Sequence, residues 1–165
     1  KMSSSEYKLD VSEFDLNELT RICIIGLCNR IDEKNLELNV DFEDDILKVI
    51  ADKDAITRVV INLLDNAIKY NKDNGKITVF VGESAKGVEL SVKDTGIGIP
   101  PEDTERIFER FYRVDKSHSK KVGGTGLGLS IVKHVCACHN ATIRVKSKVG
   151  KGTTIYVTFP NNVNN

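Results

Sequence analysis

Apolar and polar positions follow two rhythms along the chain, which predict helices and strands. Apolar residues recur every three to four positions, as on one face of a helix, in three segments: 16–30, 57–70 and 126–139. Strands are expected over 36–42, 46–50, 76–81, 88–94, 141–146 and 153–159. The first of these is expected to be half-buried, because its apolar residues alternate with polar ones. Gly150 and Gly152 indicate a hairpin between the last two of these strands.

The predicted helices and antiparallel strands thus follow one another in mixed order along the sequence, which favours an α+β fold. We predict a two-layer α/β sandwich whose mixed, mostly antiparallel sheet carries the helices on one face. Asp15 is expected to cap the first helix, Asp52 or Asp54 the second, and Asn140 to end the third in a left-handed conformation. Residues 14–160 are expected to form one domain, preceded by a frayed segment (1–13) and followed by a short tail (161–165).

Segment 57–70 combines an apolar face with an unusual polar face. Its apolar face gathers Ile56, Val59, Val60, Leu63, Leu64 and Ala67. The opposite stripe holds Asn62 and Asn66, which lie in the helix interior, where asparagine is a poor helix former. Two carboxamides one turn apart offer oxygens to a hydrated cation and N–H groups to phosphate, and Lys69 follows one turn later. We predict a functional role for this stripe; the alternative is a solvated face that contains asparagine by chance.

Composition narrows the function classes without choosing among them. The 165 residues carry 24 basic and 24 acidic side chains, so bulk charge gives no reason to expect a nucleic-acid or membrane-surface role. No apolar run approaches the roughly 18 residues that cross a bilayer. The four cysteines show no disulfide framework, and we interpret them as small buried thiols rather than metal ligands.

Two glycine-rich motifs carry candidate chemistry. DTGIGIP at 94–100 follows a predicted strand, and a carboxylate between glycines suits an exocyclic amine such as that of adenine; a turn with special dihedral angles is the alternative. GGTGLGL at 123–129 precedes a predicted helix, where free backbone N–H groups and the helix dipole favour an anion. The second motif is neither a Walker A loop nor a dinucleotide fingerprint.

Five stretches stand in fixed order: the asparagine helix, DTGIG, the aromatic and basic IFERFYR at 107–113, GTGLGL, and GKGT ending at Thr153. This order resembles the ATP-binding catalytic domain of bacterial sensor histidine kinases, in the wider Bergerat-fold family shared with type II topoisomerases and mismatch-repair clamps. The stretches match that family's N, G1, F, G2 and G3 boxes. The resemblance covers residues 14–160.

The resemblance implies roles for the first two boxes. Asn62 matches the asparagine that holds Mg²⁺, Asn66 and Lys69 match groups that contact the phosphates of ATP, and Tyr70 matches a ring against the base. Asp94 matches the aspartate that reads adenine. The residues that match the floor of the nucleotide pocket are Gly96, Gly98 and Ile99.

The resemblance also implies roles for the remaining boxes. Residues 100–124 match a mobile ATP lid, in which Arg113 faces the γ-phosphate and Phe108 and Phe111 dock the lid against its neighbours. Thr153 falls in the strand that lines the adenine. The residues that match the phosphate loop are Gly124, Thr125, Gly126, Leu127, Gly128 and Leu129.

The implied function is a kinase domain that binds Mg·ATP and donates its γ-phosphate to a histidine on a separate, upstream dimerisation domain. None of His118, His134 and His139 stands in the expected His-Glu-x-x-Thr/Asn-Pro context, so the acceptor is expected elsewhere in a longer protein. A response regulator is the implied partner. The chain itself is expected to be a monomer and its parent a homodimeric membrane sensor with this domain in the cytoplasm.

The sequence leaves two alternative functions. An ATP-driven clamp of the wider family would carry a glutamate base where this chain has Asn62, which cannot take a proton. A nucleotide-binding module without catalysis would be expected to have lost some of the five motifs. One departure is His139-Asn140-Ala141 in place of the family's usual His-Gly-Gly, which we expect to matter little because asparagine tolerates the left-handed conformation.

Overall fold

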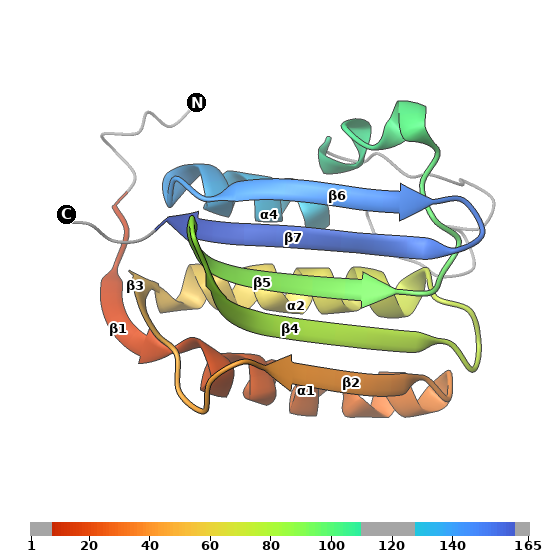
Figure 1. The fold of residues 1–165 in the computed structure, drawn as a ribbon, viewed down its shortest axis with the longest axis horizontal. Coiled ribbons are helices and arrows are strands. Elements are labelled where there is room, and N and C mark those ends of the chain that lie inside the picture. The colour runs from red at the N-terminus through yellow and green to blue at the C-terminus, as the bar shows by residue number, and fades with distance from the viewer. Residues whose placement is uncertain (1–7, 110–127, 161–165) are drawn as a thin grey trace.

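The computed structural model describes residues 8–109 and 128–160, in which a five-stranded sheet is covered on one face by helices (Figure 1). The strand order is β2 (Glu37–Phe42), β4 (Lys76–Ser84), β5 (Gly87–Asp94), β7 (Gly152–Pro160) and β6 (Thr142–Lys148). Strands β2 and β4 are parallel, and the other neighbours are antiparallel. Strands β1 (Val11–Asp15) and β3 (Lys48–Asp52) form a separate antiparallel ribbon.

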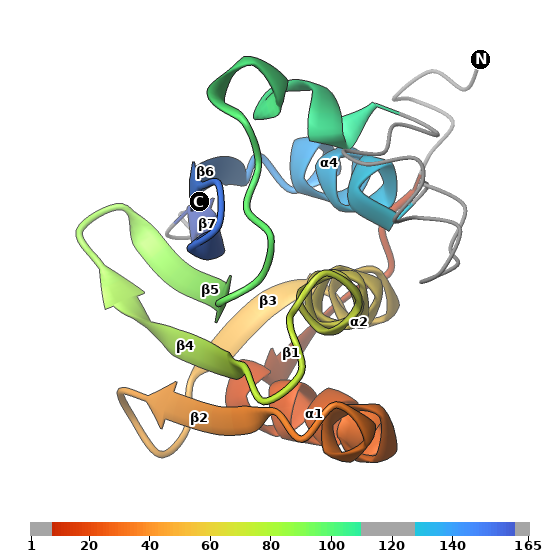
Figure 2. The same ribbon diagram turned by 90° about the vertical axis from the view of Figure 1, so that its right-hand side faces the viewer.

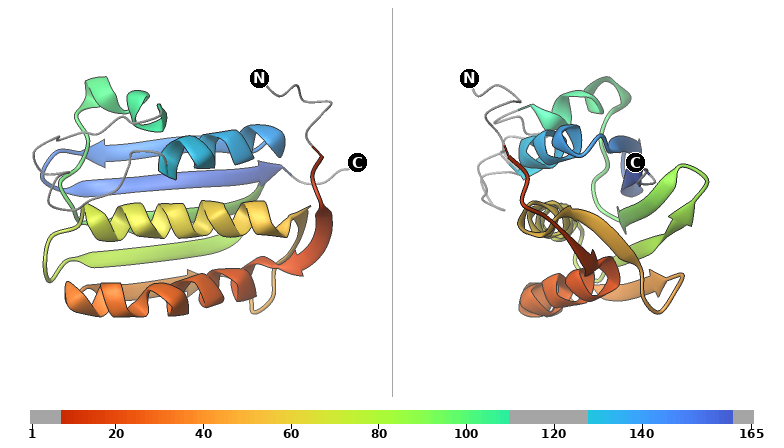
Figure 3. Two further views of the ribbon diagram at one scale, coloured as in Figure 1. Left: turned by 180° about the vertical axis from the view of Figure 1, so that it is seen from behind. Right: turned by 90° about the vertical axis from the view of Figure 1, so that its left-hand side faces the viewer.

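The helices α1 (Leu16–Glu33), α2 (Lys53–Lys69) and α4 (Gly128–Cys138) form the second layer, seen end-on in Figure 2. Helix α2 lies between the other two (Figure 3). This arrangement confirms the predicted α+β sandwich with a mixed, mostly antiparallel sheet. None of the helices within the described ranges is long and apolar enough to cross a bilayer.

The core is built around α2. The whole predicted apolar face of this helix is buried. It belongs to one hydrophobic core with buried residues of the sheet: Ile77, Val79, Val81, Leu90, Val92, Ile155 and Val157. Each fully buried Val, Leu or Ile contributes about 1.5–3 kcal/mol of transfer free energy. The position of α2 over the sheet is therefore strongly determined, and its polar stripe is held at one fixed place.

The predicted elements are found with shifted ends. Strand β1 begins at Val11, inside the segment that we expected to be frayed, because it pairs with β3. Strand β2 was expected to be half-buried but is largely exposed, since it lies at the sheet edge, where Val40 is 42% exposed. Cys23 and Cys136 are buried thiols as predicted, whereas Cys28 is exposed.

Polar groups fix the helix ends. Asp15 Oδ1 accepts from Asn17 N and Leu47 N, both at 3.0 Å. Asp52 Oδ1 accepts from Ala55 N at 3.2 Å, so Asp52 rather than Asp54 is the N-cap of α2. Asn140 adopts a φ of 57° after α4, as predicted.

The C-terminus of α2 is capped by a lysine from the end of α1. Lys34 Nζ donates to the carbonyl oxygens of Ile68, Lys69 and Asn71 at 2.8, 3.0 and 3.1 Å. An ammonium group suits the negative end of the helix dipole. Lys34 is only partly exposed, so these bonds form partly out of water, and this burial lowers the pKa of Lys34.

Lys34→Met should lower the free energy of unfolding by about 1–3 kcal/mol, because three carbonyls lose a charged donor. Urea denaturation followed by circular dichroism measures this change. Lys86→Met, an equal substitution at an exposed position, is the control and should stay within about 0.5 kcal/mol. Equal stability of the two variants would contradict the capping role.

Candidate functional site

The asparagine stripe of α2 meets the start of α4. Asn62 Nδ2 donates to Arg58 O at 2.8 Å, which leaves Oδ1 directed away from the helix backbone. A Cβ placed on Gly128 would lie 3.0 Å from that Oδ1. The fold therefore brings together Asn62 and Gly128, which the sequence predicted as parts of one site.

The turn after β5 rests on the C-terminus of α2. Ile97 N donates to Tyr70 O at 3.1 Å. A Cβ on Gly96 would overlap this same carbonyl, so only glycine allows the backbones to approach so closely. Tyr70, Gly96 and the end of the asparagine stripe thus lie side by side.

Asp94 is the buried charge of this region. It is 7% exposed, and its Oδ1 accepts from Gly96 N at 2.8 Å and from Thr153 N at 3.3 Å. Its Oδ2 has no hydrogen-bond partner among residues 8–109 and 128–160. Burial raises the pKa of Asp94 to about 6, and the two backbone hydrogen bonds oppose that rise.

The hairpin of β6 and β7 closes the other side of the turn. Gly98 has a φ of +76°, and a Cβ there would overlap Lys148 O. Ile99 N donates to Ser147 Oγ at 2.7 Å, and Ser147 Oγ lies 2.7 Å from Thr153 Oγ1. Ile99 and Thr153, predicted from separate motifs, are thereby linked through Ser147.

Two supporting residues escaped the sequence analysis. The sequence around Ser147 contains no motif that would predict a role for it; the residue is notable only for its inward position in β6. Asn71 carries no functional prediction from the sequence, yet its buried amide donates to Lys76 O at 3.1 Å and accepts from Thr95 Oγ1 at 2.9 Å. Its burial depends on contacts that are distant in sequence, so no pattern could reveal it.

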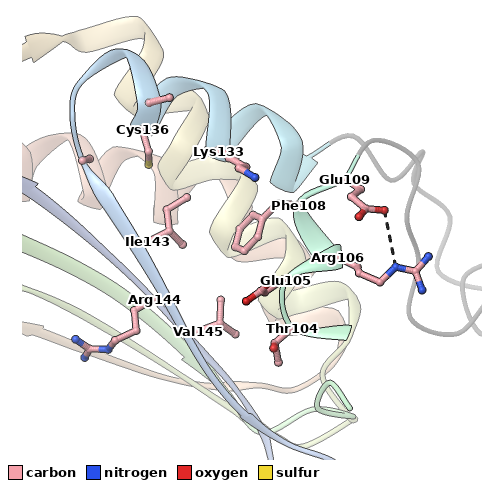
Figure 4. A pocket seen from close by; sticks show the side chains of 12 residues that line it. Thr104, Glu105, Arg106, Phe108, Glu109, Lys133, Cys136, Ile143, Arg144 and Val145 are labelled. Atoms are coloured by element: carbon pink, nitrogen blue, oxygen red, sulfur yellow. Dashed lines mark ion pairs between the residues drawn. The ribbon is translucent and has the colours of Figure 1, made fainter. Parts of the chain in front are cut away.

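The described part of the predicted lid begins with two short 3₁₀ turns, η1 (Pro101–Asp103) and η2 (Arg106–Phe108). Ile107 is buried. Phe108 lines a pocket of about 750 Å³ against Cys136 of α4 and Ile143 of β6 (Figure 4). This pocket contains Phe108 but none of the residues that were predicted to contact nucleotide.

The remaining predicted residues cannot be placed. They lie outside the described ranges: Phe111, Arg113, Gly124, Thr125, Gly126 and Leu127. Leu129 is partly buried at the start of α4, packed against the core. The described site therefore comprises the polar stripe of α2, the turn 94–99, Thr153 and the first residues of α4.

Comparison with known proteins identifies the family. The profile described as histidine kinase-, DNA gyrase B- and HSP90-like ATPase matches residues 51–163. The sensor histidine kinase WalK of Bacillus subtilis is 40% identical over 97% of this chain, and the sensor-like histidine kinase SenX3 of Mycobacterium tuberculosis is 36% identical over 97%. The chain spans only 26% and 39% of the lengths of these two relatives.

Solved structures of histidine kinases are similar to this chain in both sequence and fold. The catalytic domain of histidine kinase ThkA is 31% identical with a TM-score of 0.81, covering 92% of this chain and 98% of its own. ThkA has also been solved in complex with the response regulator protein TrrA; there the kinase is 30% identical with a TM-score of 0.77, over 92% of this chain and 42% of its own. The chain therefore belongs to the histidine kinase-, DNA gyrase B- and HSP90-like ATPases and, within them, to the catalytic domains of sensor histidine kinases.

Proposed function

We propose that this domain binds Mg·ATP and donates the γ-phosphate to a histidine on a separate phosphoacceptor domain of the same sensor kinase. The observation that carries the proposal is the buried carboxylate of Asp94, whose Oδ2 has no partner among the described residues. A buried carboxylate without a cation is costly, so its presence calls for a ligand that donates to it.

The exocyclic amine of adenine fits this carboxylate. Oδ1 is occupied by Gly96 N and Thr153 N, which hold the group in place and leave Oδ2 to accept from the base. The glycine contacts at Gly96 and Gly98 bring backbone rather than side chains to the pocket floor. In this proposal Tyr70, Ile99 and Thr153 line the base.

The polar stripe of α2 suits the phosphates and the metal. Asn62 presents Oδ1, an oxygen donor of the kind that Mg²⁺ prefers, and the remaining ligands would be phosphate oxygens and water. A bound Mg²⁺ would neutralise charge on the phosphates during transfer. Asn66 and Lys69 would contact the phosphates, with backbone N–H groups of residues 124–129.

We assign Arg113 to the γ-phosphate, where a cation stabilises the charge of the transferring group. Phe108 and Phe111 would dock the lid, 100–124. Water would be a poor acceptor here, because Asn62 stands where a hydrolysing relative needs a glutamate base. This difference favours the kinase over the ATP-driven clamp.

The wider partners follow from the same proposal. The ThkA–TrrA complex supports a response regulator as the downstream partner. WalK and SenX3 are much longer than this chain, which supports a longer parent protein. We propose that this parent is a homodimeric membrane sensor, with the domain described here a monomeric unit in the cytoplasm. We propose no nucleic-acid partner and no direct membrane contact for the domain.

Asp94→Asn should weaken ATP binding by about 1–3 kcal/mol, because a charged acceptor is replaced by a group that also carries N–H donors. Isothermal titration calorimetry with Mg·ATP measures the change. Asp41→Asn, an equal substitution at an exposed position of β2, should leave the affinity unaltered. Equal affinities of the unaltered domain for ATP and GTP would refute the assignment of Asp94 to the adenine amine.

Asp94 should also make stability depend on pH. The native state keeps this proton up to about pH 6, whereas the unfolded chain loses it near pH 3.8, so the native state becomes relatively less stable as pH rises between these values. The unfolding free energy of the unaltered domain, minus that of Asp94→Asn, should therefore fall by up to about 3 kcal/mol from pH 4 to pH 7. Urea titrations across this range test it; a constant difference would rule it out.

The domain alone should bind Mg·ATP but neither label itself nor hydrolyse it quickly, since positioning of a nucleophile supplies up to roughly 7–11 kcal/mol of barrier lowering. Adding the phosphoacceptor domain of the same protein in trans, with radiolabelled ATP, should give acid-labile label on its histidine. Arg113→Ala should slow this transfer far more than it weakens ATP binding. Rapid phosphate release by the domain alone would favour the clamp, and label on His118, His134 or His139 would refute the transfer to a separate domain.

A further inference from the structure

One carboxylate on α2 holds two cations at the edge of the proposed phosphate site. Asp65 Oδ1 lies 2.6 Å from Arg30 Nη1 of α1, and Asp65 Oδ2 lies 3.1 Å from Lys69 Nζ. Each cation thus uses a different oxygen of the same group. Figure 3 shows α1 and α2 side by side, which is what brings Arg30 across to Asp65.

The two ion pairs differ because the Lys69 side chain can reach a phosphate, whereas Arg30 contacts Asp65 from the neighbouring helix. Arg30 projects from the last turn of α1 and contacts the neighbouring helix. Lys69 is one turn beyond Asp65 and beside the asparagine stripe, so its side chain can turn from the carboxylate to a phosphate. Its main chain stays in place, because Lys34 Nζ donates to Lys69 O. A fixed backbone with a movable ammonium group is what a phosphate contact requires.

The ion pairs of Asp65 are weak enough for Lys69 to exchange the carboxylate for a phosphate. The side chains of Asp65, Lys69 and Arg30 are 26%, 24% and 39% exposed, so each pair is weak. If Asp65 had Lys69 alone, moving the lysine to a phosphate would leave the carboxylate unpaired beside an anionic ligand. Arg30 removes this penalty, because it remains on Asp65 when Lys69 leaves.

We infer that Asp65 and Arg30 are positioning residues for Lys69: Asp65 holds the ammonium group ready, and Arg30 allows its release to the phosphates of ATP. The inference rests on the proposed function, in which Lys69 contacts phosphate. It predicts that the two partners of one ion pair have opposite effects on nucleotide affinity, whereas loss of a purely structural pair would act in one direction.

The test is a set of calorimetric titrations with Mg·ATP on the unaltered domain and on single and double variants. Asp65→Asn frees Lys69 and should strengthen binding about two- to five-fold, the size that a partly exposed pair supports. Arg30→Met leaves Lys69 as the sole counter-ion of Asp65 and should weaken binding by a similar factor. In a Lys69→Met background both effects should disappear.

Controls separate positioning from bulk charge and from damage to the fold. Glu18→Gln removes an equal charge from an exposed position of α1 and should leave affinity unchanged. Urea denaturation of every variant reports losses of stability. Changes in the same direction for Asp65→Asn and Arg30→Met, or effects that persist in the Lys69→Met background, would overturn the inference alone. Failure of the unaltered domain to bind Mg·ATP would overturn the proposed function as well.

Discussion

Close contact between backbones at three glycines is the constraint on which the site depends. Gly96 lies against the carbonyl of Tyr70, Gly98 against that of Lys148, and Gly152 against that of Asp94. Any larger residue at these places would push the turn 94–99 away from α2 or from the hairpin. These contacts join the end of a helix, the end of a strand and a hairpin, and so they set the distance between Asp94 and the polar stripe of α2.

Under the proposed function, this construction sets stability against function at Asp94. The surrounding backbone removes water from the carboxylate and supplies two N–H donors, but no cation among the described residues neutralises it. The raised pKa of Asp94 has the same cause, the loss of water around the carboxylate. A protein selected for stability alone would place an apolar or amide side chain here, as cores usually do. The aspartate is explained instead by the proposed ligand, which donates a hydrogen bond to it.

Most of the fold and part of the site could be predicted from the sequence, for definite physical reasons. Every residue predicted for the apolar face of α2 is buried, because periodicity directly reports burial in a central helix. The buried set also includes Ala55 and Ile68, which the prediction left out. The exposure of β2 and the pairing of β1 with β3 were missed, because sheet order depends on contacts between distant segments. Motif order predicted that Asn62 and Gly128 belong to one site, and the fold brings them together. Lys34, Asn71 and Ser147 act through contacts that leave no local pattern.

Under the proposed function, helix α2 separates two requirements that a phosphate site must meet together. Its main chain must be rigid, and the buried apolar face together with the Lys34 cap secures that end of the helix. Its charged side chains must remain free to exchange partners, and the weak, partly exposed pairs around Asp65 permit this. The Lys34 cap acts on backbone carbonyl oxygens, whereas the ion pairs join side chains. The main chain of α2 can therefore be rigid while its charged side chains remain mobile. If Asp65 and Lys69 formed a buried ion pair, the lysine could not move freely to a phosphate. Its departure would leave a desolvated carboxylate without a counter-ion, which is strongly unfavourable.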